Sequence, residues 1–285
     1  MAEGWKAVPA GRYRGQNVVA SQDGKRWTVN QISLEDYTRG TVPGEVPASW
    51  EPEALKAMAI VVRSYAWAHL GQKGAFDLVP DVRDQHYCGR NCEEDSTNRA
   101  VDDTEGLVLY WDGKPLTAYN HSCCAGATED VREIWGGPVT RPLAGVNCRW
   151  CLRSKHYGPW TFVIEKASLA KRIAGAIGAG RRVVEVRTEG ETPSGRVRTV
   201  VVTTDLKEVL IPAGRFRLAL GSAEFRSTRF TVRDDGSTVS FVGTGWGHGV
   251  GLCQEGARVM AESGRDCEYI LRYYFPGADI VRAAR

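Results

Sequence analysis

The stretch that most constrains the fold is SWEPEALKAMAIVVRSYAWAHL, residues 49–70, because it predicts a helix with a long apolar face. Apolar residues recur in it at spacings of three and four, which places them on one side of a helix: Leu55, Met58, Ala59, Val62, Ala66 and Leu70. Such a face has to be covered by other elements. We therefore expect this helix to lie in the core.

Two carboxylates stand at the start of this helix. Pro52 suits the first helical position, which makes Glu51 the cap residue and puts Glu53 in the first turn. Both acids complement the positive end of the helix dipole. Position alone leaves open whether either of them also does chemistry.

The remaining patterns predict an α+β protein of mixed β-hairpins and helices. Hairpins are expected around Asp23-Gly24 and Asp112-Gly113, since both dipeptides tolerate positive φ. Residues 155–240 form a possible inserted or flanking β-rich subdomain, with a helix over 165–180 and strands over 182–190, 195–204 and 229–243. A glycine loop then runs into a helix before residue 264, and a last helix is stopped by Pro276 and Gly277.

Composition and charge exclude several classes of protein. No run of 18 apolar residues occurs, so we expect no transmembrane span, and the start MAEGWKAVPAG lacks the basic and apolar regions of a signal peptide. The formal charge is only +3 and the Lys and Arg residues are scattered. This pattern argues against nucleic acid as the main partner.

Eight cysteines are more than a typical cytosolic enzyme carries. They come in four pairs along the chain: Cys88/Cys92, Cys123/Cys124, Cys148/Cys151 and Cys253/Cys267. In an oxidising compartment such pairs form disulfides, whereas in either compartment two short-spaced pairs can hold a tetrahedral zinc ion. Both interpretations stay open.

Two polar stretches could line a binding site. NHSCCAGATED follows the second hairpin and carries His121 and Ser122. GWGHGVGLCQEGA carries His248 and Gln254 on a loop with five glycines, which lets the backbone approach a ligand. No Lys-Ser or Lys-Thr follows these glycines, so the loop is not typical of nucleotide binding.

Three long segments, taken in order, resemble the SpoIID/LytB family, named for stage II sporulation protein D. They are residues 34–68 (LEDYTRGTVPGEVPASWEPEALKAMAIVVRSYAWA), 103–137 (DTEGLVLYWDGKPLTAYNHSCCAGATEDVREIWGG) and 243–278 (GTGWGHGVGLCQEGARVMAESGRDCEYILRYYFPGA). The resemblance implies one catalytic unit over residues 1–285 with a substrate groove. It also implies a peptidoglycan lytic transglycosylase, which cleaves the MurNAc-GlcNAc bond and leaves 1,6-anhydro-MurNAc ends.

The residue that matches the family's catalytic glutamate is Glu53. As an acid it would protonate the glycosidic oxygen, and as a base it would then accept the proton of the muramic 6-hydroxyl as that oxygen attacks the anomeric carbon. The dipole favours ionised Glu53, so its pKa has to be raised when the glycan binds, with Trp50 or Tyr65 as candidate apolar neighbours.

The resemblance also assigns second-tier residues to the groove. Six side chains are expected to hydrogen-bond sugar hydroxyls: Gln85, Tyr87, His121, Ser122, His248 and Gln254. The sequence departs from the family pattern at Cys123 and Cys124, directly after His121 and Ser122, and again in VNCRWC.

Some members of the family carry a zinc ion near the active site, and the short-spaced cysteine pairs of this chain resemble such a site. Four ligands are predicted here, Cys88, Cys92, Cys148 and Cys151, with His86 or His121 as substitutes. The extracytoplasmic location that the family implies leaves disulfides as the alternative. The chemistry itself needs no cofactor, so either arrangement is structural.

The resemblance sets the expected partners, location and competing functions. The expected partners are peptidoglycan glycan strands, with or without stem peptides, and a cell-wall amidase. The expected location is the cell wall or periplasm, once a signal or anchor has been removed. Sporulation is one setting. One alternative is a non-catalytic activator of an amidase. The other is a hydrolytic muramidase that pairs Glu53 with Asp36, Asp84 or Glu129.

Overall fold

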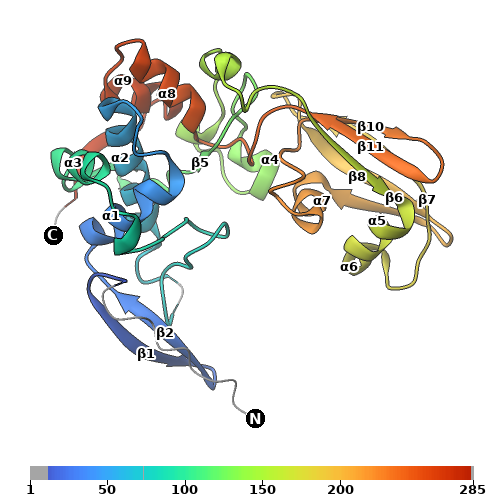
Figure 1. Ribbon diagram of the computed structural model, residues 1–285, viewed down its shortest axis with the longest axis horizontal. Coiled ribbons are helices and arrows are strands. Elements are labelled where there is room, and N and C mark those ends of the chain that lie inside the picture. The colour runs from blue at the N-terminus through green and yellow to red at the C-terminus, as the bar shows by residue number, and fades with distance from the viewer. Residues whose placement is uncertain (1–11, 73, 284–285) are drawn as a thin grey trace. The chain divides into compact units, whose positions relative to one another are not determined.

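A computed structural model describes residues 12–72 and 74–283 of the chain (Figure 1). The expectation about a signal peptide concerns residues 1–11 and lies outside the described residues. The chain forms two compact units. Unit 1 holds the residues up to Tyr119, Met260–Arg272 and the chain from Gly277, and unit 2 holds Asn120–Val259 and Tyr273–Pro276.

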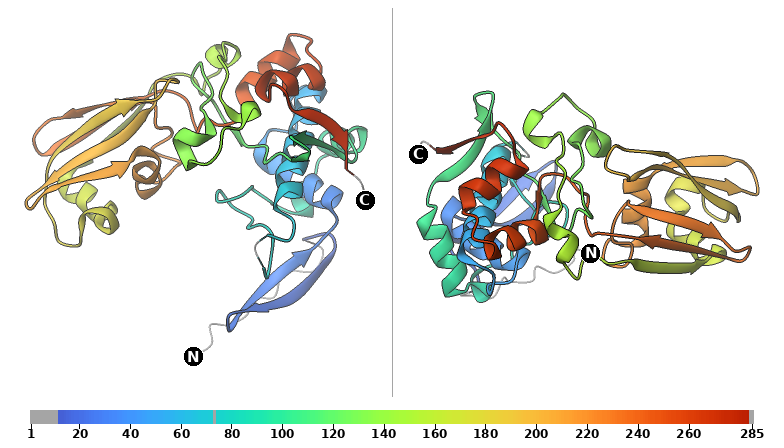
Figure 2. Two further views of the ribbon diagram at one scale, coloured as in Figure 1. Left: turned by 180° about the vertical axis from the view of Figure 1, so that it is seen from behind. Right: turned by 90° about the horizontal axis from the view of Figure 1, so that it is seen from above.

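The secondary structure confirms the predicted α+β class, with helices and several small sheets in both units (Figures 1 and 2). Within residues 12–72 and 74–283, no helix is both long and apolar enough to cross a bilayer.

Unit 1 combines a helical core with two small sheets. Its elements are β1 (Gln16–Gln22), β2 (Lys25–Gln31), α1 (Leu34–Glu45), α2 (Pro52–His69), the 3-10 helix η1 (Arg90–Cys92), α3 (Asp95–Asp103), β3 (Leu107–Trp111), β4 (Lys114–Pro115) and β13 (Asp279–Arg282). The strands β1 and β2 form the predicted hairpin around Asp23-Gly24, where both residues have positive φ. The second predicted hairpin is β3 and β4, and β13 pairs antiparallel with the other edge of β3.

Helix α2 is the centre of unit 1, as its sequence pattern predicts. It packs against α1, α3 and β3 and is buried on nearly all sides rather than on one face. Leu70 is the exception to the predicted core face, since it is 47% exposed. The helix ends at His69, and Leu70 has a non-helical backbone conformation, so its side chain does not continue the apolar face of the helix.

A buried charge ties α2 to its neighbours. The guanidinium of Arg63 is fully buried and makes a two-pronged ion pair with Glu35 of α1, with nitrogen–oxygen distances of 2.9 and 2.7 Å. Its remaining donors reach the carbonyl oxygens of Leu107 and Val101, in β3 and α3. One side chain of α2 therefore contacts three elements around that helix: α1, α3 and β3.

Unit 2 contains two three-stranded sheets and several short elements. Its elements are β5 (Asn120–His121), α4 (Val131–Trp135), η2 (Arg141–Leu143), η3 (Trp150–Arg153), β6 (Trp160–Glu165), α5 (Lys166–Arg172), α6 (Ala174–Ile177), β7 (Val183–Glu191), β8 (Val197–Thr204), β9 (Glu208–Pro212), α7 (Ala213–Leu220), β10 (Phe230–Asp234), β11 (Thr238–Gly243) and β12 (Leu252–Cys253). The helices α8 (Gln254–Glu262) and α9 (Cys267–Tyr274) each contain one of the points where the chain passes from one unit to the other.

The larger part of unit 2 is the β-rich segment expected around residues 155–240. Its two sheets have the orders β7-β8-β9 and β10-β11-β6, and they share one apolar core with α5, α6 and α7 (Figures 1 and 2). Aromatic rings form a cluster within this core, in which the ring centroid of Phe225 lies 5.0 Å from those of Trp160, Phe230 and Phe241. The helix expected over 165–180 is divided into α5 and α6 at Ile173.

Candidate active site

Glu53 lies in the first turn of α2, where the Pro52 start predicted it. One carboxylate oxygen accepts a hydrogen bond from the Lys56 ammonium at 2.9 Å, and the other accepts from the backbone N–H of Cys267 at 2.8 Å. The side chain is 33% exposed. Glu51 occupies the cap position, but its side chain makes no capping hydrogen bond within the described chain. The carboxylate of Glu53 is thus both held and accessible.

The protein as it stands favours the ionised form of Glu53. Partial burial raises the pKa of the carboxyl, but hydrogen bonds from Lys56 and Cys267 outweigh this effect and leave the pKa below its ordinary value. Lys56 has a second acidic neighbour, because its nitrogen also lies 3.4 Å from Asp103. Tyr65, one of the two aromatic residues expected to raise this pKa, donates its hydroxyl to Asp84. The pKa of Glu53 is therefore not raised in the way that the acid role expected from the resemblance would require.

Gln85 and Tyr87, the other predicted site residues of unit 1, pack together against Tyr37 of α1. The hydroxyl of Tyr37 donates to the Gln85 side-chain oxygen at 3.0 Å, and the Tyr87 ring stacks on Tyr37 at 5.3 Å. Tyr87 also donates its hydroxyl to Asn30 at 2.7 Å. Gln85 is only 2% exposed. These contacts give both residues a structural role in packing α1.

In unit 2 the structure brings His121 and His248 together. Their rings lie 5.6 Å apart, and Trp135 packs against His248 at 5.0 Å. His121 is 4% exposed and bonds the carbonyl of Val250 through Nδ1, whereas its Nε2 has no partner within the described residues. Burial lowers the pKa of His121 well below its ordinary value and that of His248 to about 3, so both rings are neutral at pH 7.

Ser122 and Gln254 join this group through a short parallel strand pair. Strands β5 and β12 align Asn120 with Leu252 and His121 with Cys253. The Gln254 amide donates to Asn120 at 2.7 Å, and the Ser122 carbonyl accepts from the Glu255 backbone N–H at 3.0 Å. The glycine loop and the end of the second hairpin therefore form one polar region of unit 2.

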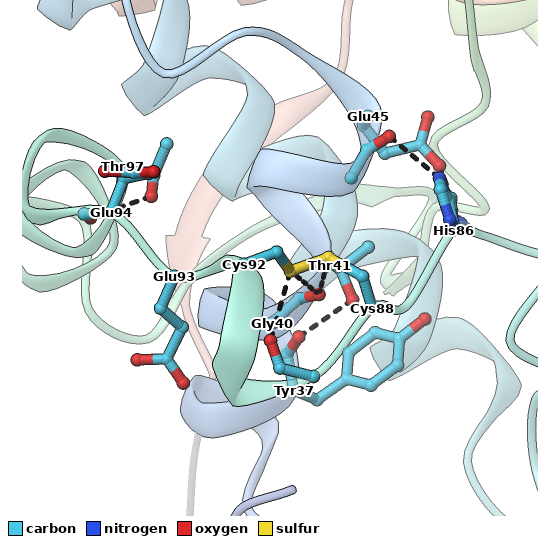
Figure 3. The surroundings of a disulfide bond; sticks show 12 residues. Tyr37, Gly40, Thr41, Glu45, His86, Cys88, Cys92, Glu93, Glu94 and Thr97 are labelled. Atoms are coloured by element: carbon cyan, nitrogen blue, oxygen red, sulfur yellow. Dashed lines mark hydrogen bonds between the residues drawn. A yellow bond between two sulfur atoms is a disulfide. The ribbon is translucent and has the colours of Figure 1, made fainter. Parts of the chain in front are cut away.

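The cysteines are arranged differently from the prediction. Cys88 and Cys92 form a disulfide with each other beside Gly40 of α1 (Figure 3), so their sulfur atoms cannot join Cys148 and Cys151 in one ligand set. The predicted four-residue set is wrong in these two members. His86 does not replace them, since it lies on the surface with its Nδ1 against the carbonyl of Gly44.

Cys148 and Cys151 instead meet two cysteines from distant segments. The sulfur atoms of Cys124, Cys148, Cys151 and Cys253 all lie within 4.8 Å of one another, and all four residues are buried. Cys123, the direct neighbour of Cys124, is not in this group. No spacing rule connects positions 124 and 253, which is why the sequence did not reveal the set.

The chain matches known proteins over most of its length. Residues 22–111 match the family model described as Stage II sporulation protein, and residues 155–251 match a domain of unknown function (DUF8618). The chain is 30% identical to Stage II sporulation protein D of Bacillus amyloliquefaciens over 278 residues, which cover 90% of this chain and 76% of that protein. The chain belongs to the stage II sporulation protein D family.

Two further relatives come from Bacillus subtilis. Its Stage II sporulation protein D is 28% identical over 279 residues, which cover 90% of this chain and 76% of that protein. A protein named Amidase enhancer is 28% identical over 292 residues, which cover 85% of this chain but only 40% of that protein. The first family match includes α2 and Glu53, whereas the second coincides with the two sheets of unit 2.

Proposed function

We propose that this protein acts on the bacterial cell wall as a peptidoglycan lytic transglycosylase, with Glu53 as its single acid and base. The observation that carries the proposal is a partly exposed carboxylate at the start of a rigid, buried helix, with one donor on each oxygen. Membership of the stage II sporulation protein D family supports the cell-wall setting.

The proposed reaction needs only one carboxyl group. Neutral Glu53 gives its proton to the glycosidic oxygen as the bond from that oxygen to the muramic anomeric carbon breaks. The muramic 6-hydroxyl oxygen then bonds to the same carbon, and its proton goes to the Glu53 carboxylate. Because the nucleophile belongs to the sugar itself, it has a high effective concentration and no second carboxylate has to activate water.

Lys56 gives Glu53 a way to become the acid. A glycan bound over Glu53 would displace water and favour the neutral carboxyl. Lys56 could then transfer its hydrogen bond to Asp103, 3.4 Å away in the free protein. The Cys267 N–H would stay in place and keep the carboxyl oriented. In this scheme Lys56 is a positioning residue that sets the protonation of Glu53.

The polar region of unit 2 carries the other candidate residues for hydrogen bonds to a glycan strand. With Nδ1–H directed to the Val250 carbonyl, neutral His121 keeps Nε2 as an acceptor, but this atom is buried and would have to be uncovered before a sugar hydroxyl could reach it. His248, Ser122 and Gln254 remain candidates on the same segments. Gln85 and Tyr87 are better explained as supports of α1 through Tyr37.

The second candidate function is activation of an amidase without catalysis. It is favoured by the relative named Amidase enhancer. The hydrolytic muramidase is the remaining alternative, and its candidate second carboxylates have partners of their own, as Glu53 does. Asp36 pairs with Arg39, Asp84 accepts from Tyr65, and Glu129 accepts from two hydroxyl groups in unit 2.

Digestion of purified peptidoglycan, with and without stem peptides, separates these functions by product mass. Anhydro ends indicate the transglycosylase, reducing ends indicate a muramidase, and intact strands that an added amidase cuts faster indicate an activator. Glu53→Gln should reduce anhydro products by at least about 100-fold, since it removes the transferable proton. Glu51→Gln is the matched control and should keep wild-type products. Near-wild-type release by Glu53→Gln would overturn the assignment.

A further inference from the structure

The four-cysteine cluster of unit 2 has the dimensions of a metal site. A zinc ion holds thiolates at about 2.3 Å, which places the sulfur atoms of a tetrahedral site about 3.8 Å apart. The sulfur atoms of Cys124 and Cys151 lie 3.3 Å apart, and all four sulfur atoms lie within 4.8 Å of one another. We propose that Cys124, Cys148, Cys151 and Cys253 bind one structural zinc ion.

The donor set fits zinc better than other common metals. Four soft thiolates in a tetrahedral arrangement select zinc or iron, whereas magnesium and calcium take oxygen ligands. The exposed fraction of each cysteine is essentially zero, so the four thiolates would close the coordination sphere. A closed site with no open position is structural rather than catalytic.

Hydrogen-bond donors already surround the sulfur atoms. The backbone N–H of Cys124 donates to the Cys253 sulfur at 3.3 Å, and the Tyr274 hydroxyl lies 3.1 Å from the Cys148 sulfur. Donors of this kind stabilise thiolates and orient them toward a metal. Tyr274 is 1% exposed, so its hydroxyl is committed to this position.

A buried cation lies next to the cluster. Arg196 is 1% exposed, and it donates to the carbonyl oxygens of Cys124 and Ala127 and to the Ser194 hydroxyl. The Ser194 hydroxyl in turn donates to the buried carboxylate of Glu129, which is one counter-charge for this guanidinium. Burying a cation is costly even when it is paired. Four thiolates around Zn²⁺ carry a formal charge of −2 and would add to the negative charge of Glu129, whereas four neutral thiols would not.

The proposed zinc would join three separate segments of unit 2. Cys124 follows β5, Cys148 and Cys151 flank the start of η3, and Cys253 lies in β12. Cys253 is paired with His121 and is followed at once by Gln254. The metal would therefore hold the strand pair that carries two of the candidate glycan-binding residues. This site does not depend on the reaction proposed for Glu53.

Metal analysis of the purified full chain tests the site directly. We expect about one zinc per chain. Cys124→Ser and Cys253→Ser should lose it, whereas Cys123→Ser, which changes the adjacent buried cysteine, should retain it. The double variant Cys88→Ser/Cys92→Ser should also retain it. Zinc retained by Cys253→Ser, zinc lost equally by Cys123→Ser, or iron in place of zinc would overturn the proposal.

Measurements on the wild-type chain avoid variants that fail to fold. Denaturation in a chelator should release the zinc and expose six titratable thiols, since Cys88 and Cys92 are the only bonded pair among the described cysteines. Replacement of zinc by cobalt should give the intense absorption of tetrahedral cobalt thiolates. Two titratable thiols and no metal would mean that the cluster forms two disulfides instead, and the proposal would fail.

Discussion

Replacing Lys56 with Met tests whether this lysine controls the protonation of Glu53. The substitution removes the hydrogen bond and the positive charge that lower the pKa of the Glu53 carboxyl, so that pKa should rise. A larger fraction of the protein then carries the neutral acid at any pH above the pKa. The alkaline limb of the pH profile for anhydro product formation should move to higher pH.

The size of the effect follows from the exposure of the pair. The Lys56 and Glu53 side chains are 24% and 33% exposed and stand three residues apart on one helix. Partly exposed pairs of this kind contribute about 0.2–1 kcal/mol. At about 1.4 kcal/mol for each factor of ten, the proton-binding constant of Glu53 should rise between about 1.4-fold and 5-fold. Global stability should fall by no more than the same energy.

Asp103→Asn supplies a control of opposite sign. It removes the other acidic neighbour of Lys56 without touching Glu53, so the lysine should commit to Glu53 and the alkaline limb should move to lower pH. The assay is the initial rate of anhydro product release against pH for the three proteins, with an NMR titration of the Glu53 carboxyl. Shifts of the same sign in both variants, or an unchanged Glu53 titration in Lys56→Met, would refute the reasoning.

Two stability predictions follow from buried contacts. Glu35→Gln leaves the fully buried guanidinium of Arg63 without its counter-charge. It should lower the free energy of unfolding, measured by urea titration, by about 3 kcal/mol. A double-mutant cycle with Arg63→Met should show strong coupling between the two residues. Additive losses would contradict the ion pair. Gly256→Ala should cost about 1–3 kcal/mol, because its Cβ would lie 1.9 Å from a buried tyrosine hydroxyl and 3.0 Å from a cysteine sulfur. The matched variant Gly214→Ala, with open space around it in α7, should be neutral or stabilising by up to about 1 kcal/mol, as measured by thermal unfolding.

Local sequence signals predicted the elements that depend on neighbouring residues. The apolar spacing predicted α2, Pro52 predicted where that helix begins, and two Asp-Gly pairs predicted hairpin turns with positive φ. The contact between Glu53 and Lys56 is local in the same sense, since the two residues stand three positions apart on one helix. These features are fixed by backbone geometry over a few residues, which a single sequence records.

Contacts between distant positions could not be predicted in the same way. The short spacing of Cys88 and Cys92 suggested metal ligands, but the two residues bond to each other, and the partners of Cys148 and Cys151 come from positions 124 and 253. The counter-charge of Arg63 likewise lies 28 residues earlier in the chain. The local pattern of a single sequence does not determine which of several chemically compatible, distant residues a side chain contacts in the folded protein.

The hydrogen bond from Cys267 to Glu53 also determines when the site can exist during synthesis. The two residues stand 214 positions apart, and β3 pairs with β13, which follows Cys267 in the sequence. A ribosome therefore adds more than 200 residues after Glu53 before the carboxylate can acquire its second donor. Contacts of such long range form late in folding, because the intervening loop has to close first. A nascent chain that ends before Cys267 leaves Glu53 without this donor, so assembly of the site has to follow synthesis of the segment that carries Cys267.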